Sequence, residues 1–102
     1  MEIEKIATYY GYGHQSRQLI EEMAELTQAI NKFWRYEMLC SDYLPTEDTN
    51  RSFRAHIAEE IADVEICIEQ VKYLLGIKNE VESWRDEKIK RTLKGAGNDV
   101  RG

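Results

Sequence analysis

Two stretches of this chain repeat one pattern of apolar residues at helical spacing. Within each stretch the apolar positions are separated by alternating steps of four and three, and the second stretch follows the first by 38 positions. On a helix, this spacing places the side chains in one narrow stripe. The stripes consist of Leu19, Met23, Leu26, Ile30 and Phe33, and of Ile57, Ile61, Val64, Ile68, Val71 and Leu75. The pattern predicts an all-α fold in which two amphipathic helices form an antiparallel hairpin.

Glycine and proline positions predict where the first half of the chain changes direction. A short helix over residues 2–10 stops at Gly11, and the first long helix covers residues 14–36. The loop after it covers residues 39–52 and contains the only proline, Pro45, among short polar residues. Loops of this length inside small domains tend to be functional or mobile.

The second long helix has a predicted cap at each end. Asn50 or Ser52 is expected to be its N-cap, and Gly76 is placed to end it in a left-handed turn. A strongly charged third helix covers residues 78–93. The predicted architecture is therefore a helical hairpin plus a third helix, completed as a helical bundle by oligomerisation.

The chain is short for a domain that must bury its own core. Its 102 residues, 42% hydrophobic and 32% charged, are predicted to form a single helical domain over residues 1–94 and a flexible tail over residues 95–102. The first long helix also has a second apolar edge, formed by Ile20, Ala24 and Trp34. This additional edge predicts a homodimer or a homotetramer.

Charge and hydropathy argue against two classes of partner. No apolar run approaches the roughly 18 residues that a membrane span needs, and the acidic start is not a signal peptide, so we expect a cytoplasmic protein with no membrane partner. The formal net charge of −5 disfavours binding to a nucleic acid polymer. Cys40 and Cys67 lack metal-ligand spacing, and Cys67 is expected to pack as a small apolar side chain.

Each long helix carries the same acidic pair beside its apolar stripe. On a helical wheel, Glu22 and Glu25 lie about 60° and about 120° to one side of the first stripe. Glu60 and Asp63 lie at the same angles, on the same side, of the second stripe. If the two stripes of an antiparallel hairpin face each other, a pseudo-twofold axis relates the two helices. This axis is perpendicular to the plane that contains both helix axes. All four carboxylates then converge on one face.

Four convergent carboxylates favour a divalent cation. Two like charges about 4 Å apart repel by about 4 kcal/mol at an effective dielectric constant near 20. Ligand sets made only of oxygen select magnesium, manganese or calcium over zinc. The pattern therefore predicts a site for Mg²⁺, or for Mn²⁺, and through it phosphate chemistry. The alternative is a pair of solvated helix faces, where neighbouring like charges cost only about 0.2 to 0.5 kcal/mol per pair.

The two acidic motifs resemble the signature of a known family. Glu22-Met-Ala-Glu25 followed by Glu60-Ile-Ala-Asp63, each preceded by a further Glu, is similar to the motif pair of the MazG-like, all-α nucleoside triphosphate pyrophosphatase superfamily. The resemblance covers roughly residues 10–91. It implies hydrolysis of a nucleoside triphosphate between the α and β phosphates, giving a nucleoside monophosphate and pyrophosphate. It also implies that the four motif carboxylates hold magnesium.

The resemblance implies roles for three further residues. A ligand carboxylate or Glu21 would help to remove a proton from the attacking water. Lys88 and Arg91 would bind substrate phosphates, although both also suit a solvated helix C-terminus. The chain departs from better-known relatives at Gln70, where they often have Asn, and at Asp86, near which they often have an amide residue.

The sequence leaves other functions open. Phosphoribosyl-ATP pyrophosphatase activity is compatible with the same resemblance. A function of another class is a non-catalytic helical interaction module whose acidic face binds a basic partner or only a structural cation. His14 and His56 are expected to be caps or structural polar residues, because neither acidic motif has the Glu-x-x-His spacing of di-iron bundles.

Overall fold

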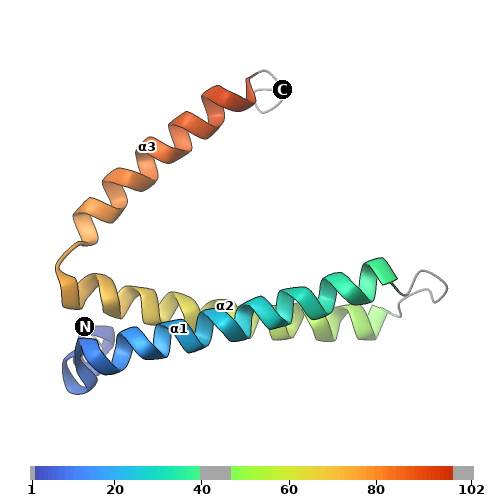
Figure 1. Cartoon of the computed structure of the whole chain (residues 1–102), viewed down its shortest axis with the longest axis horizontal. Coiled ribbons are helices and arrows are strands. Elements are labelled where there is room, and N and C mark those ends of the chain that lie inside the picture. The colour runs from blue at the N-terminus through green and yellow to red at the C-terminus, as the bar shows by residue number, and fades with distance from the viewer. Residues whose placement is uncertain (1, 40–46, 98–102) are drawn as a thin grey trace.

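The described part of the chain, residues 2–39 and 47–97 of a computed structural model, forms three helices and no strand (Figure 1). The helices are α1 (Glu2–Leu39), α2 (Glu47–Leu75) and α3 (Lys78–Ala96). The predicted all-α class is therefore confirmed. Helices α1 and α2 run side by side as an antiparallel hairpin, while α3 leads away from the end of α2.

Helix α1 contains a sharp kink at Gly11. This residue has φ 82° and ψ 168°, so the helix over its first residues and the helix that follows point in different directions. An L-residue with a side chain rarely adopts this conformation, which explains the glycine. The kink confirms the predicted stop at Gly11 and folds the N-terminal turns back beside the hairpin (Figure 1).

Helix α2 begins earlier than its predicted caps. Asn50 and Ser52 both lie inside the helix, so the N-cap prediction is wrong. The acidic residue Asp48 lies in the first turn of the helix, where the dipole of a helix N-terminus stabilises a negative charge. Asn50 instead donates a hydrogen bond of 3.2 Å to Glu37 at the end of α1. Half of the loop predicted over residues 39–52, including its proline, lies outside the described residues, and the other half is helical, so the loop prediction is wrong for residues 39 and 47–52.

The end of α2 follows the prediction. Gly76 adopts the left-handed conformation, with φ 65°. The backbone N–H of Gly76 donates to the carbonyl of Tyr73, and the N–H of Ile77 donates to the carbonyl of Lys72, both at 3.1 Å. These bonds satisfy carbonyls that the helix end would otherwise leave without partners.

Helix α3 is longer than predicted, and the other helices cover little of its surface. It continues to Ala96, into the predicted tail, and Gly97 ends it by donating a backbone hydrogen bond to Leu93. Residues 98–102 lie outside the described part. No residue of α3 is buried, and among the described helices it contacts α2 but not α1. The third helix therefore takes no part in the core of this single chain.

The two long helices pack along a seam that is only partly apolar. Its buried apolar residues include Ala29, Val64 and Cys67, which confirms that Cys67 packs as an apolar side chain. Two polar residues of α2, Glu60 and Gln70, are buried in the same seam. The centre of the molecule therefore combines apolar packing with buried polar groups.

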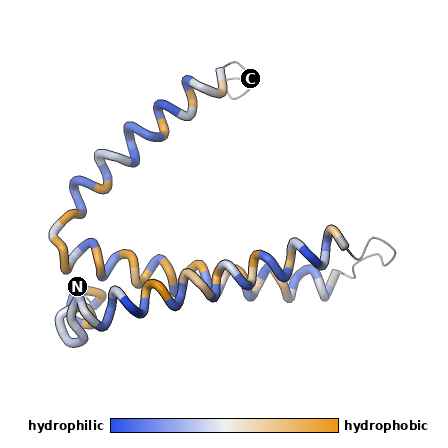
Figure 2. The backbone as a smooth tube through the Cα atoms, in the orientation of Figure 1, coloured by the Kyte–Doolittle hydropathy of each residue, from blue (hydrophilic) through white to orange (hydrophobic). Residues whose placement is uncertain are grey.

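The apolar stripes do not face each other directly. Met23 and Ile30 of α1 remain 43% and 47% exposed, and Ile61 and Ile68 of α2 remain 39% and 38% exposed. The prediction of facing stripes is therefore wrong in detail. Each helix is rotated about its axis, so that one edge of its stripe and the first carboxylate of its motif point toward the other helix. Figure 2 shows apolar residues along both helices of the hairpin.

Contacts at both ends of the hairpin fix its register. Near the N-terminal kink, Gln15 Nε2 donates a 2.6 Å hydrogen bond to Gln70 Oε1, and both side chains are buried. Near the connecting loop, the rings of Phe33 and Phe53 stack with centroids 5.6 Å apart. This register places the two acidic motifs opposite each other. Among the described residues, no helix is both long enough and apolar enough to cross a membrane.

Candidate metal centre

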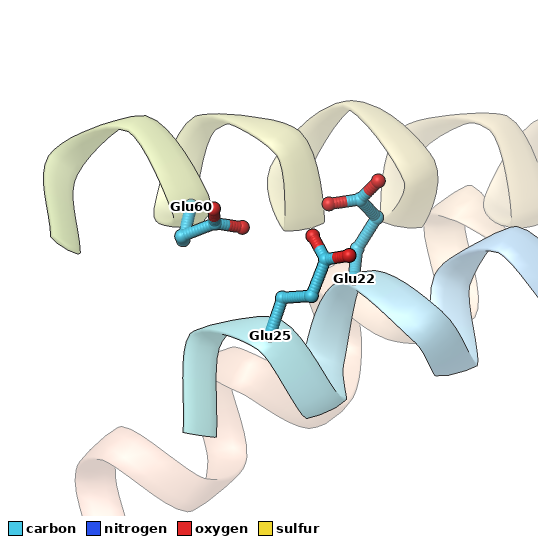
Figure 3. Close-up of side chains that lie close together, drawn as sticks. All are labelled: Glu22, Glu25 and Glu60. Carbon is cyan, nitrogen blue, oxygen red and sulfur yellow. The ribbon is translucent and has the colours of Figure 1, made fainter. Parts of the chain in front are cut away.

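Three carboxylates meet at the middle of the hairpin seam. Glu22 and Glu25 come from successive turns of α1, and Glu60 comes from α2. One carboxylate oxygen of each lies within 4.8 Å of those of the other two. Figure 3 shows Glu22 and Glu25 close together between the helices, with Glu60 facing them from α2. We call these three residues the carboxylate cluster.

Two carboxylates of the cluster are held by equivalent neighbours. Gln18 Nε2 donates a 2.8 Å hydrogen bond to Glu22 Oε1. His56 Nε2 lies 3.3 Å from Glu60 Oε1. Each neighbour precedes its glutamate by four positions, one helical turn, and the two pairs are 38 positions apart. The internal repeat therefore extends to the side chains that hold the carboxylates in place.

The second oxygens of the same two carboxylates have no partner. Glu22 Oε2 and Glu60 Oε2 are both buried, and neither accepts a hydrogen bond. Glu60 as a whole is only 8% exposed. A buried charged oxygen without a hydrogen bond is costly in free energy. A divalent cation binds several carboxylate oxygens at once, so it would satisfy these two oxygens and the third carboxylate beside them.

The electrostatic environment raises the pKa of Glu22. Burial is the largest cause, because it removes water from the ionised carboxylate, and the hydrogen bond from Gln18 opposes it. The negative charges of Glu25 and Asp63 raise the pKa further, and so does a hydrogen bond to Glu25 that Glu22 can donate only when it is protonated. Without a cation, Glu22 therefore holds its proton more tightly than an ordinary glutamate.

Asp63 lies beside the carboxylate cluster but outside its 4.8 Å group. It is half-buried, and its charge acts on both Glu22 and Cys67. Burial and the charges of Glu22 and Asp63 raise the pKa of the Cys67 thiol. Cys67 therefore stays protonated, and the donors available to a cation at this position are carboxylate oxygens.

The other predicted site residues are not brought to the cluster. Glu21 is exposed and lies outside the 4.8 Å group. Lys88 and Arg91 lie on α3, which leads away from the hairpin (Figure 1). The Lys88 Nζ atom is 6.0 Å from the centroid of the Trp84 ring, and Arg91 pairs with Glu87 of its own helix. The predicted role of these two cations therefore requires a movement of α3 or a second copy of the chain.

Sequence reasoning did not identify the side chains that support the cluster. His56 was expected to be a cap or a structural polar residue, and its contact with Glu60 agrees with the second role, but its partner was not predicted. The sequence did contain a signal for these supporting side chains. Gln18 and His56 are equivalent positions of the repeat, and each precedes the first glutamate of its motif by one helical turn. The buried contact of Gln15 with Gln70 joins residues 55 positions apart, and no local pattern predicts it.

The donor set fits a hard divalent cation. It consists of oxygens only, two of them buried and unpartnered, which favours magnesium or manganese over zinc. Comparison with known proteins identifies no family, since no family model, no curated protein and no solved structure matches the chain. The chemistry of the site therefore rests on its own geometry.

Proposed function

We propose that this protein is a magnesium-dependent nucleotide pyrophosphohydrolase, which cleaves a nucleoside triphosphate to a nucleoside monophosphate and pyrophosphate. The observation that carries the proposal is the pair of buried, unpartnered oxygens on Glu22 and Glu60 within the carboxylate cluster. The resemblance of the two acidic motifs to the MazG-like superfamily supplies the reaction. The protein acts in the cytoplasm as a homodimer or a homotetramer.

The carboxylates have distinct tasks in this proposal. Glu22 and Glu60 would hold the cation through the oxygens that Gln18 and His56 leave free, and Glu25 would complete the cluster. Asp63, half-buried beside the cluster, would be the fourth carboxylate that holds the cation. When bound, magnesium neutralises phosphate charge and lowers the pKa of water. Positioning and charge neutralisation are the main needs of phosphoryl transfer, and no covalent intermediate is required.

The reaction breaks one phosphoanhydride bond. The oxygen of water attacks the α-phosphorus, the bond from that phosphorus to the bridging oxygen breaks, and pyrophosphate leaves with the bridging oxygen. The proton of the water passes to a carboxylate. Glu25 is suited to this task, because it belongs to the cluster and remains exposed to solvent. Glu21, also exposed and one turn away, is the alternative base.

Substrate phosphates need cations in addition to magnesium. The described part of the hairpin has thirteen Asp and Glu residues and only seven Lys and Arg residues. Helix α3 has the opposite balance, with six basic and four acidic residues. Lys88 and Arg91 are therefore proposed to bind the β and γ phosphates, once α3 of the same or another chain lies near the cluster.

Release of pyrophosphate tests the proposal. We expect the wild type to release pyrophosphate from at least one member of a panel of ribo- and deoxynucleoside triphosphates when magnesium is present. Glu60→Gln removes a cation ligand and should lower the rate by about a hundredfold or more, because one charged ligand is lost. Glu59→Gln is the matched control, since the adjacent Glu59 is exposed and lies outside the cluster.

The same pyrophosphate-release assay distinguishes two alternative functions. Phosphoribosyl-ATP, added to the panel, separates the phosphoribosyl-ATP pyrophosphatase reaction from action on simple triphosphates. A non-catalytic acidic interaction module would release no pyrophosphate from any of them. Failure of the wild type on the whole panel, with folded protein and saturating magnesium, would therefore favour the module.

A further inference from the structure

Helix α3 and the hairpin form a V whose apex is a link of two residues (Figure 1). Only Gly76 and Ile77 lie between the end of α2 and the start of α3. Gly76 has φ 65°, and a Cβ atom there would meet no other atom within 4 Å. Ile77 has φ −114° and ψ 17°, outside the helical range. The direction of α3 therefore depends on the backbone angles of two residues, as it does at a hinge.

The apex of the V contains an open crevice. Its lining includes Glu69 and Tyr73 of α2 and Lys78 and Asn79 of α3, together with the first residues of α1. Tyr73 is 46% exposed, and no residue of α3 is buried. The inside of the V therefore faces the side of α2 that carries Glu69 and Tyr73, and α3 has room to approach that side.

This side of α2 and one side of α3 have complementary patterns. On α2 it consists of Ala62, Ile66, Glu69 and Tyr73, which are separated by steps of four, three and four. We call these residues the outer stripe of α2. On α3, steps of three, four and three give a stripe of Val81, Trp84, Lys88 and Arg91. The first stripe has an acidic residue and no basic one, the second has two basic residues and no acidic one, and this spacing is that of helices in bundles.

The lengths of the two helices bring these stripes into register. In an antiparallel pair, residues at equal distances from the link lie at the same level. Ala62 precedes Gly76 by 14 positions, and Arg91 follows Ile77 by 14 positions. At 1.5 Å per residue, each is about 21 Å from the link. An α3 that turned to lie along α2 would therefore place Arg91 opposite Ala62.

The same register matches the exposed apolar residues near the link. Trp84 would lie between Tyr73 and Ile66 of the outer stripe. These three side chains are 54%, 46% and 44% exposed in the open V, so their contact would remove a large apolar area from water.

The charged residues match farther from the link. Lys88 would lie within about one turn of Glu69. Ala62 is small and leaves space for the long side chain of Arg91, which would be level with the adjacent Asp63. Closure would therefore pair basic residues of α3 with the acidic hairpin.

We propose that α3 is a lid, which closes about Gly76 and Ile77 onto the outer stripe of α2 in the same chain and carries Arg91 to the level of Asp63. The link favours α3 of the same chain, because it holds this helix beside the stripe at a high effective concentration. The use of Arg91 at the carboxylate cluster rests on the proposed function, whereas the closure itself does not.

Disulfide trapping in the full chain tests the closure. Glu59 and Gly95 continue the two stripes by one step, both are exposed, and a Cβ atom at Gly95 would meet open space. We therefore combine Glu59→Cys with Gly95→Cys in a Cys40→Ser background, and we keep Cys67, which is buried. Mild oxidation should link the two new cysteines within one chain, detected by non-reducing electrophoresis and by mass spectrometry of the linked peptides.

A matched pair controls for random encounters of a free helix. Ile61 is two positions from Glu59, on the opposite side of α2, and is also exposed. We expect Glu59→Cys with Gly95→Cys to cross-link about ten times faster than Ile61→Cys with Gly95→Cys, because a disulfide requires close Cα atoms. Equal rates, no cross-link, or links only between different chains would overturn the proposal.

Trp84 provides a second measurement that needs no new cysteine. Trp34→Phe leaves Trp84 as the only tryptophan. In this background, Ile66→Glu should increase quenching of Trp84 by acrylamide about twofold, because closure would bury the new carboxylate. Ile68→Glu, on the opposite side of α2 and similarly exposed, should leave the quenching unchanged. Equal quenching in the two variants, each verified as helical by circular dichroism, would contradict closure onto the outer stripe.

Added magnesium and inorganic pyrophosphate separate the lid from the proposed function. Both should accelerate the cross-link of Glu59→Cys with Gly95→Cys if Arg91 meets phosphates at the cluster. A cross-link within one chain that they do not accelerate would confirm the closure and remove the role of Arg91. A protein that releases pyrophosphate from triphosphates but forms no such cross-link would overturn the lid and leave the proposed function intact.

Discussion

Glu22 and Glu60 each have one oxygen held by a neighbouring side chain and one buried oxygen without a partner. This arrangement is unfavourable for the protein alone, because a buried carboxylate loses its hydration. Natural proteins retain such groups mainly where they have a function. At the scale of the residue, the two oxygens are therefore the strongest indication of a cation site in this chain.

The raised pKa of Glu22 predicts how the stability of the cation-free protein depends on pH. Because the folded state binds the proton more tightly than the unfolded chain, the contribution of Glu22 is fully present below its ordinary value of 4.5. It is lost as the pH rises through the pKa of the folded state. Denaturant unfolding should therefore show that the wild type loses stability relative to Glu22→Gln across this range. Parallel pH profiles for the two proteins would contradict the raised pKa.

The same proton competes with the cation. Ligand carboxylates must be deprotonated, so binding of magnesium releases the proton of Glu22. We expect the affinity for magnesium to increase with pH through the pKa of Glu22 and then to become constant. Calorimetric titration at a pH below the raised pKa of Glu22, in buffers of different ionisation enthalpy, would detect the released proton, and its absence at that pH would show that Glu22 is not a ligand.

The buried amide pair predicts a non-additive effect of mutation. Replacing Gln15 or Gln70 alone by Leu leaves the other amide buried without its partner and should lower the free energy of unfolding by about 1 to 3 kcal/mol. Replacing both by Leu should recover part of that loss. The exposed Gln28 provides the control, because Gln28→Leu should change the stability by less than about 0.5 kcal/mol. Additive losses in urea unfolding would rule out coupling of the two amides.

At the scale of the helix, the N-terminal kink depends on one glycine. Gly11 has φ 82° and ψ 168°, whereas Gly13 lies in the helix without a positive φ, and a Cβ atom at either position would meet open space. Gly11→Ala should therefore destabilise the protein by about 1 to 3 kcal/mol through backbone strain alone. Gly13→Ala should stabilise it by about 0.5 to 1 kcal/mol through helix propensity. Urea unfolding of both variants compares the two effects, and changes of the same sign would contradict the kink.

The elements of the fold were predictable where a local rule determines them. Spacing of apolar residues identified both long helices, and Gly11 and Gly76 marked real ends or kinks. The start of α2 was not predictable, because Asn50 and Ser52 have the properties of N-caps but lie inside the helix. Cap propensity is a local preference that the rest of the structure overrides.

The convergence of acidic residues was predictable from helical phase, but the rotation of the helices was not. Each long helix has apolar residues both in its seam and beside it, such as Leu26 toward α2 and Met23 away from it. Sequence periodicity cannot choose between two adjacent apolar edges. The choice decides which carboxylates are buried, and in the structure it buries Glu60 while Asp63 remains at the rim.

At the scale of the whole molecule, the described chain is a two-helix hairpin with a third helix outside its core. The hairpin holds the carboxylate cluster and an excess of acidic residues, and helix α3, which has more basic than acidic residues, extends away from it (Figure 1). A single chain leaves large apolar side chains exposed on all three helices. These exposed side chains support the proposed homodimer or homotetramer.

Thermal unfolding with and without magnesium tests the central claim, that the carboxylate cluster binds a divalent cation. A ligand that binds only the folded state stabilises it by about 2.7 kcal/mol at a free concentration one hundred times its Kd. At matched ionic strength, magnesium should raise the melting temperatures of the wild type and of Glu59→Gln, and should leave that of Glu60→Gln unchanged. No effect of magnesium on the wild type, or an equal rise in Glu60→Gln, would contradict the cation site.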